Sequence, residues 1–196
     1  VAVRGEVFLE KEDFAVLNAR LEVPYANPRN LAAGTLRRLK SSETAQFPLK
    51  MFAYEAYFDD PAQSGGSHAQ ILGMLGELGF LVNKTFGLFS QDGSCGVSSF
   101  GDAQIGRYED LPRYIESRKS LRDSLSHEID GLVVKVNELA VRDFLGYTGH
   151  HPRWALAYKF DAPEAQTELT AIDVQVGRTG RITPVGRVKR VRVGNS

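Results

Sequence analysis

Four cations lie in segments that read as strands or helices, where their side chains could bind phosphate. Lys135 and Lys159 each come near the end of an apolar, strand-like run, and Arg29 and Arg37 lie in a helix-like stretch. Lysine and arginine are common partners of phosphate, and the planar guanidinium of arginine can contact two phosphate oxygens at once. These residues therefore predict a phosphate-containing ligand.

Two acids, Glu6 and Asp130, could add a second kind of chemistry. Their carboxylates could hold a hydrated magnesium ion or accept a hydrogen bond from a ribose hydroxyl. Asp130 and Lys135 are an odd number of residues apart, so a regular strand would place them on opposite faces. If both serve one site, the pleat must be interrupted between them, and we expect a bulge, a bend or a strand start at Gly131.

The first strand that must position these residues shows a clear alternation. Val3 and Val7 share one face, whereas Arg4 and Glu6 share the other. This pattern is typical of a half-buried strand with one polar face. The aromatic-rich stretch KMFAYEAYF is predicted to be another strand.

The stretch RWALAYKF alternates between bulky and small residues. The bulky face, which we predict to be core, holds Trp154, Leu156, Tyr158 and Phe160. The small face, with Ala155 and Ala157, leaves room for a flat ligand whose phosphate would meet Lys159. An alternative stays open, in which a helix covers the small residues and Lys159 extends into water.

Four stretches have helical patterns. EKEDFAVLNARL carries acids suited to a first turn, and NPRNLAAGTLRRLK is predicted to begin with Asn30 as its N-cap. SHAQILGMLGELGF has Ser67 as a candidate cap and Gly79 as a stop signal, and LPRYIESRKSL has Pro112 in its first turn. The Gly- and Ser-rich residues 90–102 are predicted to form a surface loop around Cys95.

Composition narrows the class of protein. The 196 residues are 42% hydrophobic and 24% charged, and no run is apolar enough to cross a membrane. A single cysteine excludes an internal disulfide framework and a multi-cysteine zinc site. Neither a P-loop nor a dinucleotide-binding glycine motif is present. The net charge is 0, but the charged residues after Asp173 are all basic. They are Arg178, Arg181, Arg187, Lys189, Arg190 and Arg192. A polyanion partner and a solvated basic strand are both open explanations of this tail.

The motifs in chain order resemble those of one family, the bacterial NAD-dependent DNA ligases. The resemblance rests on VRGEVF, ANPRNLAAGTLRRL, EIDGLVVKVN, PRWALAYKF and VQVGRTGRITPV. These segments look like successive motifs of the adenylation domain and the start of the OB-fold. The resemblance implies an α+β nucleotidyltransferase fold, with antiparallel sheets and flanking helices over residues 1–166. Residues 167–196, after a boundary marked by Pro163, would be the first strands of a truncated OB-fold.

The resemblance also implies an activity. A lysine would attack the α-phosphate of NAD, AMP would pass to the 5′-phosphate at a nick in double-stranded DNA, and the 3′-hydroxyl would displace AMP during replication or repair. Such an enzyme would be cytoplasmic, bacterial and monomeric, with NAD and magnesium as cofactors and no membrane partner.

Site roles follow only from the resemblance. Glu6, Lys135 and Lys159 would contact the nucleotide, and Asp130 would join them as a catalytic residue. Glu6 and Asp130 would hold magnesium through water. Arg29 and Arg37 would bind the phosphates of the nicked strand or the nucleotide side of the site, and Arg178 would contact the DNA backbone near the nick.

One departure from the family pattern matters. The nucleophile of the family lies in a Lys-x-Asp-Gly motif, which this sequence lacks. We therefore expect a fragment that cannot form the enzyme–AMP adduct alone, with the nucleophile upstream and the family's zinc finger downstream. Two alternatives remain: an ATP-dependent ligase or capping-type nucleotidyltransferase, and a non-catalytic DNA-binding module on the same scaffold.

Overall fold

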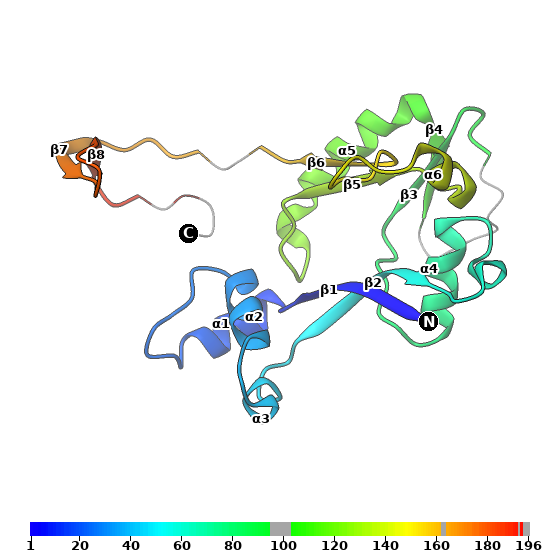
Figure 1. The fold of residues 1–196 in the computed structure, drawn as a ribbon, viewed down its shortest axis with the longest axis horizontal. Coiled ribbons are helices and arrows are strands. Elements are labelled where there is room, and N and C mark those ends of the chain that lie inside the picture. Colours follow the sequence, from blue (N-terminus) through cyan, green and yellow to red (C-terminus); the bar gives the residue numbers. More distant parts are fainter. Residues whose placement is uncertain (95–102, 162–163, 192, 194–196) are drawn as a thin grey trace. The chain divides into compact units, whose positions relative to one another are not determined.

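The structure, a computed structural model, describes residues 1–94, 103–161, 164–191 and 193. It divides into two compact units, Val1–Phe160 and Asp161–Ser196. The larger unit mixes helices with small sheets (Figure 1), in agreement with the predicted α+β class. Of the loop predicted over residues 90–102, Ser90 belongs to the end of a strand, residues 91–93 are bends, and residues 95–102 lie outside the described residues, as does the boundary residue Pro163.

The described strands form four two-stranded sheets. Three of them are antiparallel: β1 (Ala2–Phe8) with β2 (Lys50–Tyr57), β5 (Gly131–Lys135) with β6 (Ala155–Lys159), and β7 (Leu169–Val176) with β8 (Ile182–Val188). The fourth pair, β3 (Gly87–Ser90) with β4 (Gln104–Arg107), is parallel. The prediction of antiparallel sheets is therefore wrong for this pair, because both strands run in the same direction on either side of the predicted loop.

One face of the β1–β2 sheet lies in the core, and the other face is available for other contacts. Exposure alternates along β1, as predicted, and Val3 packs with Ala53 against α4 (His68–Glu77). The register shifts at Arg4/Gly5, because Arg4 pairs with Glu55 whereas Gly5 pairs with Ala53. Tyr54 is the extra residue at this bulge, so it has no partner residue in the strand register.

The helices begin and end where local chemistry dictates. Ser67 caps α4 within a capping box, and Gly79 follows its end with a φ of 86°. The prediction that Asn30 caps the second helix is wrong. Asn27 caps α2 (Pro28–Leu36) by accepting the Asn30 backbone N–H at 2.8 Å, because proline suits the first helical position and moves the start three residues earlier.

The remaining helices complete the larger unit. As predicted, α1 (Lys11–Asn18) and α5 (Leu111–Ser120), the latter with Pro112 in its first turn, are helical. The other short elements are α3 (Ser41–Thr44), α6 (Leu139–Leu145), η1 (Pro61–Ser64), η2 (Tyr108–Asp110) and η3 (Arg122–Ser124).

The β5–β6 sheet presents two unlike faces. Lys159 lies opposite Gly131, and Ala155 lies opposite Lys135, so both lysines and Ala157 share one face. β5 begins at Gly131, as predicted. A Cβ at this glycine would lie 2.2 Å from the Tyr158 carbonyl oxygen, so only glycine allows the close approach of the two strands.

The prediction of a buried bulky face on β6 is wrong in its middle. Trp154 and Phe160 are buried, but Leu156 is 68% exposed and Tyr158 is 41% exposed. Trp154 is covered by Arg142 and Tyr147 from α6 and the loop after it. The covering side chains reach the end of this face, whereas the middle of the two-stranded sheet stays open to solvent.

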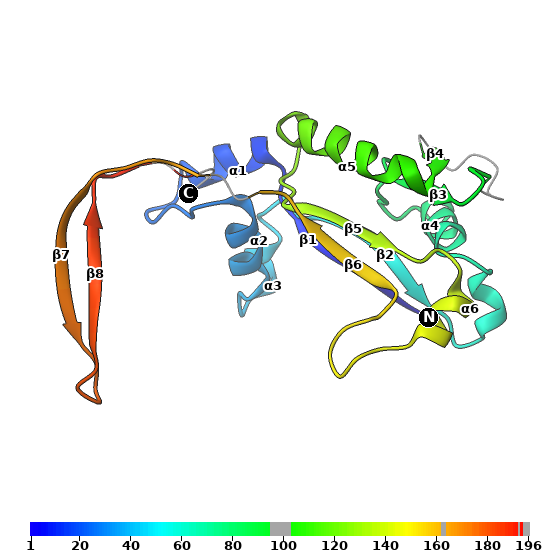
Figure 2. The ribbon, with the colours of Figure 1, turned by 90° about the horizontal axis from the view of Figure 1, so that it is seen from above.

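Within the larger unit, the β5–β6 and β1–β2 sheets run alongside each other in both ribbon views (Figures 1 and 2). The smaller unit contains the β7–β8 hairpin, as the GRTG signal predicts. Its turn closes with the Gly177 N–H donating to the Arg181 carbonyl at 2.8 Å, and Gly180 has a φ of 81°. Whether this hairpin begins an OB-fold stays a prediction.

Candidate functional site

Four of the predicted site residues come together at one end of the β5–β6 sheet. Arg29, in the first turn of α2, lies between the two acids: its Nη2 is 4.0 Å from Glu6 Oε1 and its Nη1 is 3.7 Å from Asp130 Oδ2. Lys159 Nζ lies 3.7 Å from the same Asp130 oxygen. We call these four residues the charged cluster.

The charged cluster is open to water. Its side chains are 63% to 77% exposed, and their separations are those of ion pairs rather than of short hydrogen bonds. Exposed pairs of this kind contribute little to stability. Arg29 and Lys159 can therefore exchange their carboxylate partners for an anionic ligand at small cost.

Aromatic packing holds the segment that carries Asp130. The rings of Phe8 and Phe52 stack with centroids 4.5 Å apart, and the His127 ring packs against both at 5.3 and 5.0 Å. Burial lowers the pKa of His127, which favours the neutral ring. The Phe160 N–H then donates to the Asp130 carbonyl at 2.9 Å, fixing Asp130 beside the end of β6.

Lys135 lies at the other end of the same face. Its Nζ lies 5.0 Å from the centroid of the Tyr54 ring, a cation–π distance. It lies four positions after Gly131, the partner of Lys159, which corresponds to about 13 Å along a strand. Sequence reasoning placed both lysines against one phosphate, but the structure gathers Glu6 with Lys159 and sets Lys135 apart.

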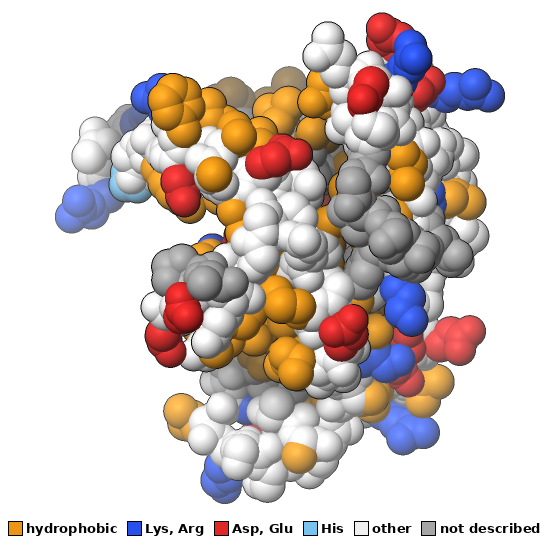
Figure 3. Space-filling view, turned by 90° about the vertical axis from the view of Figure 1, so that its right-hand side faces the viewer, with side chains coloured by type: hydrophobic (Ala, Val, Ile, Leu, Met, Phe, Trp, Pro, Cys, Tyr) orange, Lys and Arg blue, Asp and Glu red, His pale blue; other side chains and the backbone are white. Residues whose placement is uncertain are grey.

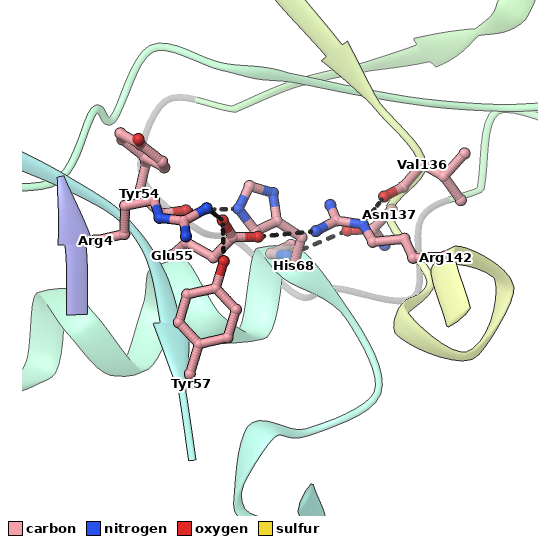
Figure 4. Close-up of polar contacts among 9 residues, drawn as sticks. Arg4, Tyr54, Glu55, Tyr57, His68, Val136, Asn137 and Arg142 are labelled. Atoms are coloured by element: carbon pink, nitrogen blue, oxygen red, sulfur yellow. Dashed lines mark hydrogen bonds and ion pairs between the residues drawn. The ribbon is translucent and has the colours of Figure 1, made fainter. Parts of the chain in front are cut away.

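Lys135 and the residues around it are partly or fully buried. We call Tyr54, Glu55, His68, Lys135 and Arg142 the buried network; Figure 4 labels all of these residues except Lys135. Glu55 and Arg142 form an ion pair at 3.6 Å with side chains only 11% and 5% exposed. Burial lowers the pKa of Lys135, although the nearby Glu55 carboxylate opposes that shift.

Two further side chains reach the Glu55 carboxylate. Arg4 Nη1 lies 3.7 Å from Oε2, and the Tyr57 hydroxyl donates a hydrogen bond to the same oxygen at 3.0 Å. Burial, reinforced by this carboxylate, raises the pKa of Tyr57 to about 12, so its hydroxyl stays protonated.

The other two predicted arginines do not join the charged cluster. Arg37 is the exposed residue at which α2 ends, eight residues after Arg29 and so about 12 Å away along the helix axis. Arg178 lies in the β7–β8 turn of the smaller unit. Their predicted contacts with DNA stay predictions.

Sequence reasoning missed most of the buried network. Tyr54 could have been found, because it falls two residues after Phe52 in an aromatic-rich strand. No comparable signal pointed to His68, Glu55 or Arg142. A histidine at the start of a helix, an acid in a strand and a base in a helix are all common on protein surfaces. Their convergence is a tertiary property of β2, α4 and α6.

The described residues give no direct support for a metal-binding cluster or for a membrane-spanning helix. Among them, no group of three or more His, Cys, Asp or Glu side chains is placed to hold a metal ion. No helix in the described ranges is long and apolar enough to span a membrane.

The face in Figure 3 carries acids and bases interspersed among hydrophobic side chains, without a patch of one sign.

Comparison with known proteins gives consistent similarities. Residues 1–163 match the family described as NAD-dependent DNA ligase adenylation domain. Among curated proteins, the chain is 41% identical to a DNA ligase of Borreliella burgdorferi over 196 residues, 100% of this chain and 27% of that protein. It is 42% identical to a DNA ligase of Gluconobacter oxydans and 44% identical to one of Neisseria gonorrhoeae, in each case over 99% of this chain. Those two matches cover 26% and 22% of the relatives, so the chain spans about a quarter of their length.

Proposed function

Because the chain belongs to the NAD-dependent DNA ligase adenylation domain family, we propose that it is the nucleotide-handling part of an enzyme that seals nicks in double-stranded DNA. NAD would supply AMP, first to the enzyme and then to the 5′-phosphate at the nick, in replication or repair. The ATP-dependent ligase or capping-type alternative is not favoured, because the matched family is the NAD-dependent branch. A purely DNA-binding module is not favoured either, since the matched region is a catalytic domain.

The observation that carries this proposal is the lysine-bearing face of the β5–β6 sheet. Val133 and Ala157 lie between Lys135 and Lys159 on that face, and Ala155 lies opposite Lys135. Their small side chains leave a flat surface. The base of an adenylate would lie near the Tyr54 ring, because planar rings stack favourably. Its phosphate would reach Lys159 at the other end of the face.

The charged cluster suits the phosphate end chemically. Phosphoryl transfer needs little covalent help from the protein beyond positioning and charge neutralisation. Lys159 and Arg29 would neutralise the phosphate, and Glu6 would accept a hydrogen bond from a ribose hydroxyl. The chain contains no Lys-x-Asp-Gly motif, so we propose that it does not form the covalent lysine–AMP adduct by itself.

A magnesium ion fits the same end only through water. Mg²⁺ usually keeps several waters and takes one or two protein carboxylates together with substrate phosphates. Glu6 and Asp130, joined through Arg29, offer that number of carboxylates. Bound there, the ion would add positive charge beside the transferred phosphoryl group.

The remaining parts of the proposal concern partners and location. Arg37 and Arg178 would contact the DNA backbone, and the basic tail after Asp173 would favour the polyanion over a merely solvated strand. We further propose a monomer in the bacterial cytoplasm and an OB-fold that begins with the β7–β8 hairpin.

Nick sealing by the full-length natural protein tests the proposal. We expect sealing with NAD but not with ATP, and a loss of at least about 100-fold in Lys159→Ala, in line with removal of a charge-neutralising group. Lys84→Ala, which removes an exposed lysine between α4 and β3 of the larger unit, should seal nearly as wild type. Sealing that depends on ATP, or full activity of Lys159→Ala, would refute the proposal.

A further inference from the structure

One residue, His68, connects the two sheets beside Tyr54 and Lys135. Its Nε2 lies 2.7 Å from the Tyr54 carbonyl oxygen, and its backbone N–H donates to the Asn137 carbonyl at 2.8 Å. The next residue of α4, Ala69, donates its N–H to Asn137 Oδ1 at 3.1 Å. The first turn of α4 therefore binds β2 on one side and the segment that follows β5 on the other (Figure 4).

A second residue, Arg142 of α6, connects almost the same two points. Its Nη1 pairs with Glu55 Oε1 at 3.6 Å, and its Nε donates to the Val136 carbonyl at 2.5 Å. Its guanidinium lies over the Trp154 ring at 4.3 Å, so the side chain is held from a third direction.

We call the polar contacts made by His68 and those made by Arg142 the two braces. Both braces end at Tyr54 or Lys135 themselves or within two residues of them in the sequence. On β2 the braces hold Tyr54 itself and Glu55, and after β5 they hold Val136 and Asn137, the two residues that follow Lys135. The bulge leaves the Tyr54 carbonyl available for the His68 ring. Both braces therefore set the distance between the Tyr54 ring and the Lys135 ammonium.

The chemistry of His68 suits a permanent brace. A carbonyl oxygen only accepts hydrogen bonds, so Nε2 must carry the proton. Burial lowers the pKa of His68 to about 4, and the charges of Lys135 and Arg142 act in the same direction. The ring is therefore neutral at neutral pH and adds no further cation beside Lys135.

We propose that His68 and Arg142 are positioning residues for nucleotide binding, which hold Tyr54 and Lys135 in place at the end of the face where an adenine base would bind. Neither residue touches the nucleotide; each acts through the backbone or side chain next to a residue that does. This inference rests on the proposed function, since it assigns the Tyr54–Lys135 end of the face to the base.

The test uses steady-state nick sealing by the full-length natural protein, with KM for NAD, KM for nicked DNA and kcat measured separately. His68→Leu removes the donor, and His68→Asn keeps an N–H donor in a shorter side chain. Tyr57→Phe is the matched control, because it removes one hydrogen bond to Glu55 without breaking either brace. Thermal unfolding of each variant records its fold.

We expect His68→Leu to raise KM for NAD on the order of tenfold, the scale of a small misplacement of binding groups. KM for nicked DNA should stay within about twofold of wild type, His68→Asn should restore part of the loss, and Tyr57→Phe should match wild type. Should His68→Leu fail to fold, Arg142→Lys carries the same expectation, because its single ammonium cannot hold both Glu55 and Val136.

The outcomes separate the two levels of the proposal. A wild-type protein that does not use NAD would refute the proposed function itself. A wild-type protein that uses NAD, with an unchanged KM for NAD in His68→Leu, would overturn the positioning role alone. A lowered melting temperature with equal changes in both KM values would also overturn it, because that is the signature of a merely structural residue.

Discussion

The charged cluster and the buried network, at opposite ends of one sheet face, differ in how much water reaches them. The acids and bases around Asp130 are 63% to 77% exposed, whereas Glu55 and Arg142 are 11% and 5% exposed. An exposed ion pair is weak, but its members can pair with something else. A buried pair cannot lose one member without leaving the other charge desolvated.

This difference indicates how the two ends divide the work. The end at Lys135 is set by the fold before any ligand arrives, through the bulge, the His68 ring and the Arg142 guanidinium. We propose that the end at Lys159, whose ion pairs are exposed, adapts to the anion that it binds. A rigid end for the base and an adaptable end for phosphate would suit a reaction in which the phosphate is repeatedly transferred.

The largest expected effect comes from breaking the buried network. Glu55→Ala leaves Arg142 without its carboxylate, and we expect the free energy of unfolding to fall by about 3–5 kcal/mol in urea titrations. Glu43→Ala removes the acid of the more exposed pair with Arg38 and should cost less than about 1 kcal/mol. Equal losses in the two variants would contradict the distinction between buried and exposed pairs.

The next largest effect is expected in the pH dependence of the free energy of unfolding, through the protonation of His68. Folding lowers its pKa from 6.5 to about 4, so between these values the unfolded chain binds a proton that the folded chain does not. The free energy of unfolding should therefore fall as pH drops from about 6.5 to 4, by up to about 3 kcal/mol from this residue. Urea titrations at several pH values check this, and wild type and His68→Gln with parallel profiles would exclude the assignment.

A smaller loss is expected where the two strands of the shared face meet. In Gly131→Ala the new Cβ would lie 2.2 Å from the Tyr158 oxygen, so β5 and β6 must separate, at a cost of about 1–3 kcal/mol. A Cβ at Gly149 meets no atom within 4 Å, so Gly149→Ala serves as the control. Denaturant midpoints measure both, and a stable Gly131→Ala would show that the strands can shift.

The smallest stability effect is expected at the charged cluster. Asp130→Asn removes the acid shared by Arg29 and Lys159, and the free energy of unfolding should change by less than about 1 kcal/mol. Nick sealing by the full-length protein should nevertheless fall, because Asp130 would act on the ligand and not on the fold. A large loss of stability with normal sealing would reverse the roles assigned to the two ends.

The sequence predicted local features well. Alternation placed Glu6 opposite the core side of β1, and Ser67 and Gly79 marked the ends of α4. Strand parity predicted a bulge, a bend or a strand start at Gly131, and β5 begins there. Each of these depends on neighbours within a few residues, where backbone sterics and capping dominate. The prediction of Asn30 as a cap is wrong for a local reason too, because Pro28 occupies the first helical position and the residue before it, Asn27, is the cap.

What the sequence did not predict depends on tertiary contacts. The exposure of Leu156 and Tyr158 follows from the absence of cover over the middle of β6, which alternation alone cannot reveal. The separation of Lys135 from Lys159 follows from the pairing of Lys135 with Ala155. The buried network joins residues up to 88 positions apart, Tyr54 to Arg142, which no local pattern encodes.

Methyl NMR of the full-length protein during titration with AMP tests the central claim most directly. The ring current of a base on the lysine-bearing face should shift the methyl signals of Val133, Ala155 and Ala157. Val134 and Leu156 belong to the same strands but face the other way, so their signals should stay nearly unchanged. Shifts confined to the opposite face, or absent from β5 and β6 while AMP binds elsewhere, would contradict the account.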